Sequence, residues 1–236
     1  MMLTSDLQRP PLSRAVAWRE VGLAVVVLWS VLGGACFFLG AQSIYDRWGT
    51  SLNATLVLDV VFLIGCLAVI GFVFWRQRRQ GEGIVELGWG RPVRMPVIVI
   101  AVVYGLAWTA MSYMRGGDPL AFPWQRPIMM AIGLVLAFAE EIAVRGLILD
   151  RLARCGTSRI IQIVVTAGIM AVYHGVVGHS VWPSYIVSSF VLFGVLSVIY
   201  VYGGRSLTPV YIAHAMAHFL GDPALMQGVL YGVGAG

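Results

Sequence analysis

The stretch PIMMAIGLVLAFAEEIAVRGLILD, residues 127–150, decides the fold class. It is long and apolar enough to cross a lipid bilayer as a helix. It nevertheless contains two adjacent glutamates, Glu140 and Glu141, followed by Arg145. Burying an ionised carboxylate away from water carries a large free-energy penalty unless the group is paired. A membrane-spanning helix that keeps three ionisable residues is therefore a candidate functional site.

The composition of the whole 236-residue chain is that of an integral membrane protein. Hydrophobic residues make up 59% of it and charged residues only 11%, and the mean hydropathy is +0.84. Soluble domains are closer to a quarter charged. The sequence therefore predicts an all-α, polytopic transmembrane helix bundle. The net charge of +5 does not predict a nucleic-acid partner, because the arginines cluster in short loops as membrane topology demands.

Apolar segments of spanning length predict the topology. They fall at about 21–45, 52–75, 95–114, 127–149, 160–178 and 184–202, with a shorter one at about 207–220. This indicates about seven spans, and the Gly-rich tail 223–236 is a short eighth helix, a re-entrant piece or a frayed end. Arginine-rich and arginine-poor loops alternate, so the positive-inside rule puts the N-terminus in the cytoplasm. We expect one integral membrane domain over 1–236, with a cytoplasmic tail at 1–20.

The residue usage also predicts a cellular setting. All sixteen basic residues are arginine, which favours a GC-rich genome and hence a bacterial source. The predicted location is then the bacterial cytoplasmic (inner) membrane, crossed several times. The three cysteines, Cys36, Cys66 and Cys155, lack the spacing of a disulfide framework or a zinc knuckle.

The two glutamates are predicted to have different partners. On an α-helix their side chains point about 100° apart. Arg145 follows Glu141 by four residues and so stacks best over that carboxylate. This pair would leave Glu140 facing the bundle interior, and a paired carboxylate beside an unpaired one is an acid–base arrangement. The alternative is that these residues only hold helices together through polar contacts.

The four histidines all lie in the C-terminal part of the chain, at positions 174, 179, 214 and 218. His214 and His218 share one helical face. A lone histidine on a membrane helix is commonly a hydrogen-bond partner, but three of them with a glutamate pair on three spans favour a function. Glu140, His174 and the His214–His218 pair lie roughly 10–22 Å from the cytoplasmic ends of their spans. We expect them to line one water-filled cavity near the bilayer centre, with His179 near the outer surface.

Three short motifs resemble those of the CaaX protease and bacteriocin-processing family, also called Abi, of intramembrane endopeptidases. EEIAVRG, residues 140–146, matches its EExxxR motif. MAVYH matches FxxxH at His174, but Met170 replaces the phenylalanine. HAMAH matches HxxxN or HxxxD at His214, but His218 stands where Asn or Asp is usual, and a second register would pair His218 with Asp222. The motif-bearing catalytic core covers about residues 127–222.

The resemblance implies hydrolysis of a peptide bond within or near the membrane. It implies that Glu140 is the general base that activates a water, with His174 as its partner. It further implies that His214 and His218 donate hydrogen bonds to the oxyanion, and that Glu141 and Arg145 set the helix and the local field. Met170 is expected only to fill space, since methionine packs into irregular gaps.

Two alternatives to this metal-free, glutamate-type peptidase stay open. No cofactor is favoured, but zinc is possible, with His174, His214, His218 and Glu140 as ligands. A non-catalytic membrane immunity or binding protein could use the same polar pocket. The expected partners are the lipid bilayer and a membrane-embedded or lipid-anchored protein or peptide substrate. A bacterial source disfavours prenylated tails and leaves pheromone or bacteriocin precursors and surface-protein anchors open.

Overall fold

The computed structural model describes residues 9–49, 51–114, 116–177 and 182–221, and within these ranges every regular element is helical. The predicted all-α fold is therefore confirmed. The predicted tail 223–236, His179 and Asp222 lie outside the described residues. The helices of the first half are α1 (Arg14–Leu28), η2 (Trp29–Ala41), α2 (Gln42–Trp48), α3 (Leu52–Arg78) and α4 (Met95–Met114). Those of the second half are α5 (Gln125–Glu141), η3 (Ile142–Ile148), α6 (Leu149–Arg154), α7 (Arg159–Val177), α8 (Trp182–Tyr202) and α9 (Leu207–Phe219).

Serine residues cap three of these helices. The side chains of Ser13, Ser51 and Ser206 accept hydrogen bonds from backbone N–H groups in the first turns of α1, α3 and α9. The cap at Ser13 starts the first helix seven residues before the predicted span begins. The predicted tail therefore ends in helix, and its Glu20 is buried in an ion pair with Arg76 at the end of α3.

Within the described residues, five helical rods are long and apolar enough to cross a membrane. They cover Arg14–Trp48, Leu52–Arg78, Met95–Met114, Gln125–Arg154 and Tyr185–Tyr202. Their outward faces are apolar, as Ile64, Val103 and Val187 illustrate with about two thirds of their side-chain surface exposed, which is the pattern of a lipid-facing surface. The other two predicted spans are shorter: the apolar part of α7 is Arg159–Gly175, and α9 has 13 residues. The protein is thus an integral membrane protein, and the count of seven spans stays a prediction, as does the orientation of the N-terminus.

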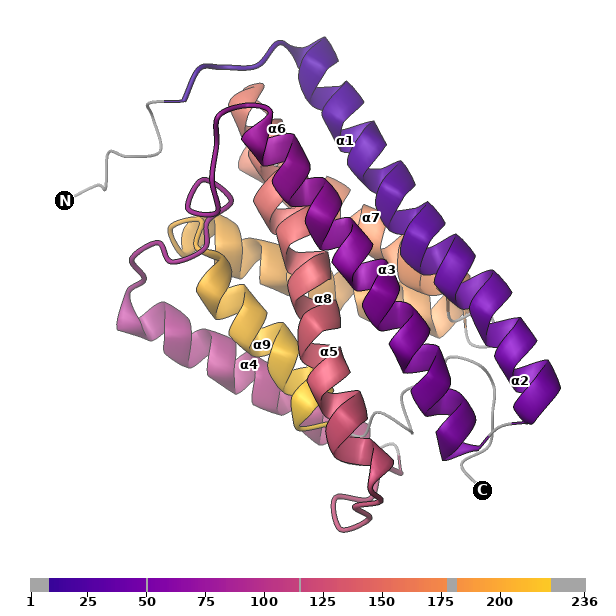
Figure 1. The fold of residues 1–236 in the computed structure, drawn as a ribbon. Helices are drawn as coiled ribbons and strands as arrows, with labels where there is room; N and C mark the ends of the chain where they lie inside the picture. The colour runs from indigo at the N-terminus through magenta and orange to yellow at the C-terminus, as the bar shows by residue number, and fades with distance from the viewer. Residues whose placement is uncertain (1–8, 50, 115, 178–181, 222–236) are drawn as a thin grey trace.

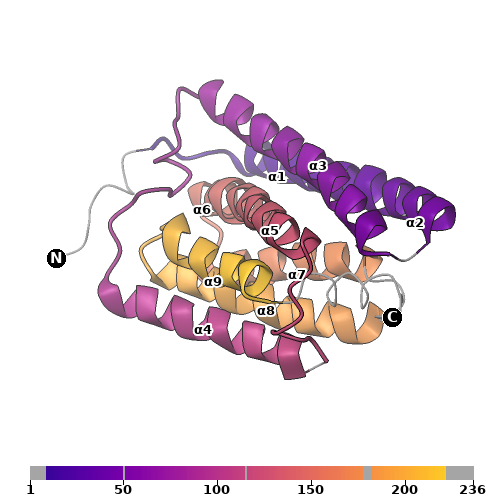
Figure 2. The ribbon, with the colours of Figure 1, turned by 60° about the horizontal axis from the view of Figure 1, so that its bottom comes forward.

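The rod of α5, η3 and α6 runs through the middle of the bundle (Figures 1 and 2). Helix α5 packs against α3 on one side and α9 on the other, while α4 packs against α9 and α7 against α8. In Figure 2, α1 and α3 form one layer and α4 and α8 the opposite one, with α5 and α9 between them. The helices that carry the sequence motifs are therefore neighbours inside the bundle.

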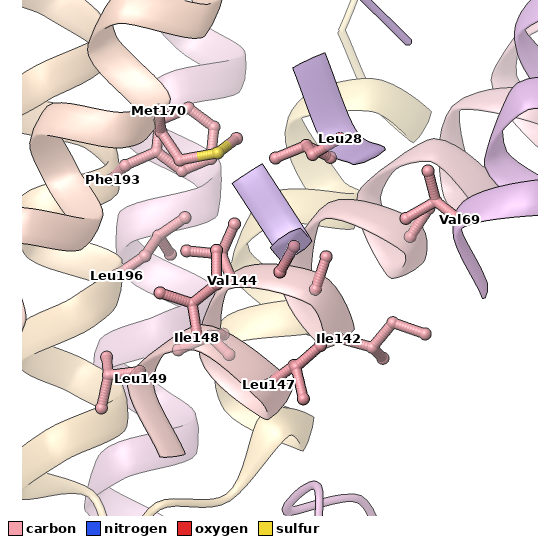
Figure 3. Close-up of a cluster of buried hydrophobic side chains, with 14 of the residues drawn as sticks. Leu28, Val69, Ile142, Val144, Leu147, Ile148, Leu149, Met170, Phe193 and Leu196 are labelled. Atoms are coloured by element: carbon pink, nitrogen blue, oxygen red, sulfur yellow. The ribbon is translucent and has the colours of Figure 1, made fainter. Parts of the chain in front are cut away.

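The segment that follows the two glutamates is a π-helix rather than the regular α-helix that the sequence predicts. Every residue of η3, Ile142–Ile148, is buried. Figure 3 shows Val144 and Ile148 of η3 near Leu196 of α8, with Leu28 and Val69 beyond the opposite side of the segment. A π-helical turn is rare and often lies at a functional site. The packing of η3 on all sides holds this uncommon geometry in place.

A connection from the first half of the chain supports this segment. We call residues 83–91, between α3 and α4, the Leu87 loop. Leu87 is fully buried against Gly146, where an added Cβ atom would lie 3.1 Å from the leucine side chain. The ring of Trp89 makes edge-on contacts with Phe138 of α5 and Tyr211 of α9, at centroid distances of 5.1 and 5.4 Å. Trp89 therefore bridges two motif-bearing helices.

Candidate active site

The six residues singled out in the sequence come from three parts of the bundle: the α5–η3 rod, α7 and α9. Glu140 and Glu141 end α5, Arg145 lies in η3, His174 is on α7, and His214 and His218 are on α9. Glu140, Glu141, Arg145 and His214 are at most 2% exposed, and the two remaining histidines are partly exposed. The fold therefore gathers the ionisable residues of the three motifs in its interior.

Arg145 is anchored at two points. One terminal nitrogen donates to Glu141 Oε1 at 2.9 Å, in the ion pair that the four-residue spacing predicts. The other terminal nitrogen donates to the backbone carbonyl of Phe193 at 2.8 Å. A buried pair needs such additional hydrogen bonds to offset the loss of hydration. Arg145 thus ties the motif helix to α8 while it neutralises Glu141.

His214 contacts both glutamates, so the expectation that they have separate partners is wrong. Its Nδ1 atom lies 2.8 Å from Glu141 Oε1, and its Nε2 atom lies 3.8 Å from Glu140 Oε2. Side chains 100° apart on one helix can still converge, because the imidazole inserts between them and presents a nitrogen on each side. The two carboxylates remain unequal, since the arginine pairs with Glu141 alone among the described residues.

The contacts of His214 indicate which of its nitrogens carries a proton. A carboxylate that pairs with Arg145 accepts hydrogen bonds, so Nδ1 of His214 is the donor to Glu141. In the neutral imidazole, Nε2 is then an acceptor and can receive the Nε2–H of His218, 3.3 Å away. Glu141, His214 and His218 thus form one hydrogen-bonded chain across two helices.

His174 is oriented by its own helix. Its Nδ1 atom lies 2.9 Å from the carbonyl oxygen of Met170, which can only accept, so Nδ1 donates. Its ring contacts the aromatic rings of Tyr173, Tyr185 and Phe193. No hydrogen bond joins His174 to Glu140 among the described residues. The Nε2 atom is therefore the one available for chemistry.

Two further residues take part in the site without a signal in the sequence motifs. The Tyr173 side chain is hydrogen-bonded to Glu140. Phe193 lies against His174, His214 and Arg145. Tyr173 directly precedes the motif histidine His174, and this position is a sequence signal that could have identified it. Phe193 sits in an apolar span and has no sequence feature that distinguishes it from its neighbours.

The residues proposed as zinc ligands do not converge on one point. Among the described residues, no three His, Cys, Asp or Glu side chains are grouped so that they could hold a metal ion. Nδ1 of His174 and Nδ1 of His214 are both engaged with protein oxygens. We therefore derive no reaction step through a metal, and metal dependence stays a question for experiment.

The family comparison covers the region in which these residues lie. Residues 122–220 match the family model described as type II CAAX prenyl endopeptidase Rce1-like. This part of the chain is similar to the Rce1-like family. The Rce1-like segment contains all three motifs and all six site residues, and it begins in the loop before α5. Comparisons with curated proteins and with solved structures found no match.

The match confirms the resemblance that the three motifs carry and supports a coarse statement of function. The Rce1-like family is one of endopeptidases, and the apolar rods make this protein an integral membrane protein. A membrane-associated peptide substrate follows from both. The roles of the individual residues, the metal requirement and the bacterial source remain predictions.

Proposed function

We propose that the protein is an intramembrane endopeptidase in which Glu140 activates the water that hydrolyses a peptide bond. The observation that carries the proposal is the inequality of the two adjacent carboxylates. Glu141 is held by Arg145 and His214. Among the described residues Glu140 has no arginine partner, and its buried Oε2 atom, like that of Glu141, has no hydrogen-bond partner. That oxygen is suited to take the proton of an attacking water.

The proposed reaction follows the path of general base and then general acid catalysis. The water oxygen bonds to the substrate carbonyl carbon while its proton passes to Glu140. The C–N bond then breaks, and the same proton passes to the departing amine. His174, with Nδ1–H committed to Met170, presents its neutral Nε2 atom as an acceptor, which supports its role as the partner of Glu140 in orienting the water.

His214 and His218 are the proposed donors to the oxyanion. Because Nδ1–H of His214 is held by Glu141, its Nε2 atom donates only when the imidazole carries a second proton. The two glutamates lie 2.8 and 3.8 Å from the His214 imidazole and hold it beside the proposed base. One well-placed oxyanion donor contributes about 10²–10³ in rate. Glu141 and Arg145 act by holding His214 and the helix in place.

Terminal proteomics tests the proposal and identifies the substrate in the same experiment. A strain that lacks the gene is complemented with the wild type or with Glu140→Gln, and the termini of its membrane proteins are compared. Loss of the base should lower cleavage by about 10²–10⁴-fold, so uncut precursors persist with Glu140→Gln. The matched control is Asp59→Asn, which changes a buried carboxyl on α3 outside the motifs and should restore cleavage.

The outcomes separate the candidate functions. If Glu140→Gln preserves both the termini and the biological phenotype, the protein is a binding or immunity protein that uses the same polar residues. If purified protein contains one zinc per chain that is lost with His214→Ala, the metal-dependent form of the hydrolysis replaces the metal-free one. The uncut proteins themselves would show whether lipid-anchored tails or membrane-embedded precursors are the substrate.

A further inference from the structure

We propose that Phe193 is a positioning residue of the active site, which holds two motif histidines and the motif arginine in one arrangement. The inference rests on the proposed function and adds a residue that lies outside the three motifs. Phe193 is on α8, which carries none of the motif residues, and its side chain is fully buried. Its surroundings decide the role.

The phenylalanine ring touches a residue from each motif. The His174 ring lies at a centroid distance of 4.7 Å with an interplanar angle of 38°, and the His214 ring lies at 5.4 Å and 85°. The guanidinium carbon of Arg145 lies over the ring, 5.1 Å from its centroid. Tilted and edge-on ring pairs and a cation over a ring face are favourable arrangements of the aromatic quadrupole. One side chain therefore restrains three polar groups that come from three helices.

The backbone of the same residue adds a fourth restraint. Its carbonyl oxygen accepts from Arg145 at 2.8 Å, and it also accepts from the Ser197 hydroxyl at 2.8 Å. Ring and carbonyl thus fix the guanidinium from two directions. Because Arg145 in turn holds Glu141, and Glu141 holds His214, the orientation of Phe193 bears on the whole hydrogen-bonded chain.

The position of the Phe193 ring is related to the one residue of the second motif that differs from the family pattern. Met170 stands where the motif has phenylalanine, four residues before His174, and it belongs to the same buried hydrophobic cluster as Phe193 (Figure 3). Met170 is fully buried, and its carbonyl accepts from His174. An aromatic ring that α7 lacks at this position is therefore supplied from α8. In this proposal Met170 fills its place in the core and leaves room for the ring of Phe193.

Loss of the ring should affect turnover more than substrate binding. Phe193→Leu keeps an apolar side chain but removes the ring contacts, so His174, His214 and Arg145 gain rotational freedom. Misplacement of catalytic groups by about 1 Å costs about 10²-fold in rate. With a cleaved protein found by the terminal proteomics as substrate, we expect kcat to fall about 10- to 100-fold, with KM changed by less than about threefold.

Two further variants separate positioning from simple loss of packing. Phe62→Leu makes the same change at a buried phenylalanine on α3, outside the motifs, and should leave kcat unchanged. The double variant Met170→Phe with Phe193→Leu returns a ring to the site from α7 and should restore at least part of kcat. A kcat for Phe193→Leu equal to that of the wild type would overturn the proposal. So would a double variant that is no more active than Phe193→Leu, because a general packing defect would not be rescued by the exchange.

A spectroscopic readout makes the test independent of catalysis. The chain has four histidines, so selectively labelled imidazoles give few NMR signals, which His→Gln variants assign. Phe193→Leu should shift the His174 and His214 signals through loss of the ring current, and Phe62→Leu should shift neither. The signals could move while the wild type and Glu140→Gln strains show the same protein termini. In that case the proposed function fails, but the contact between Phe193 and the histidines stands. If the signals do not move, the positioning role itself fails.

Discussion

Two arginines on the same central rod are fully buried in different ways. Arg145 lies in η3 among apolar side chains, and Arg151 lies in α6, six residues later. Arg145 has one carboxylate partner, Glu141, and one carbonyl partner. Arg151 contacts two carboxylates, Asp150 and Glu82, and also the Gln77 side chain. Both sites bury a guanidinium group, but they differ in the number of carboxylates that pair with it.

The charge balance of the two sites also differs. Around Arg145 there are two carboxylates for one guanidinium, and their other partners include the His214 imidazole and the Tyr173 side chain. Around Arg151 there are three guanidinium groups for two carboxylates, because Arg9 and Arg154 bind the same Asp150 and Glu82. A surplus carboxylate beside imidazoles can exchange protons at moderate free energy, whereas a cluster of arginines and paired carboxylates cannot. The first site therefore suits the proton transfer proposed above, and the second suits a role in holding chain segments together.

The largest effect is expected at Arg145. Arg145→Ala leaves Glu141 as a buried charge with no arginine, and breaking such a pair destabilises by about 3–5 kcal/mol. Thermal unfolding of the purified protein in nanodiscs measures this loss, and cleavage should disappear with it. Arg145→Lys keeps a positive charge without the forked geometry, so its stability should lie between those of the wild type and the alanine variant. Equal stabilities of the wild type and Arg145→Ala would contradict the pairing described above.

A smaller effect is expected at Arg151. In Arg151→Ala, Asp150 and Glu82 keep Arg9 and Arg154 as partners, so the expected loss of stability is about 1–3 kcal/mol. Cleavage measured at a temperature where the variant is folded should stay within about threefold of the wild type, since no residue of the proposed reaction is touched. A loss of cleavage as deep as that of Glu140→Gln would remove the distinction between the two sites.

The smallest effect is expected at Arg9, the most exposed member of the Arg151 cluster, with 20% of its side chain accessible. An ion pair near the surface contributes about 0–1 kcal/mol, and salt weakens it. Arg9→Ala should therefore lower stability slightly at low ionic strength and leave it unchanged at high ionic strength. A loss that persists in high salt would mean that Arg9 has a buried role equal to that of Arg151.

Much of the fold could be predicted from the sequence, because hydrophobic length directly determines where a helix can cross a bilayer. The predicted span of residues 95–114 coincides with α4, and 52–75 lies within α3. The spacing of Glu141 and Arg145 likewise predicts their ion pair, since residues four apart are neighbours on a helix. Apolar composition and helical period are local properties, so they do not depend on how the helices pack.

The rest of the site depends on tertiary contacts that leave no local pattern. The π-helical turn after Glu141 has an ordinary apolar composition, and every one of its residues is buried by the surrounding helices. The convergence of both glutamates on His214 requires the crossing of α5 and α9. Phe193 is one apolar residue in an apolar helix, and only the arrangement of α7, α8 and η3 gives it three polar neighbours.

The Leu87 loop has a consequence for the modularity of the protein. The loop lies outside the Rce1-like segment, yet Leu87 packs against Gly146 of the first motif. Gly88 has a φ of +101°, which favours glycine, and its carbonyl accepts a hydrogen bond from the backbone N–H of Leu207 at the start of α9. Excising residues 122–220, or grafting them onto other helices, would strip the motif rods of this support. Chimeras between family members should therefore exchange the loop and the motif glycine as one unit, because the two surfaces are shaped to each other.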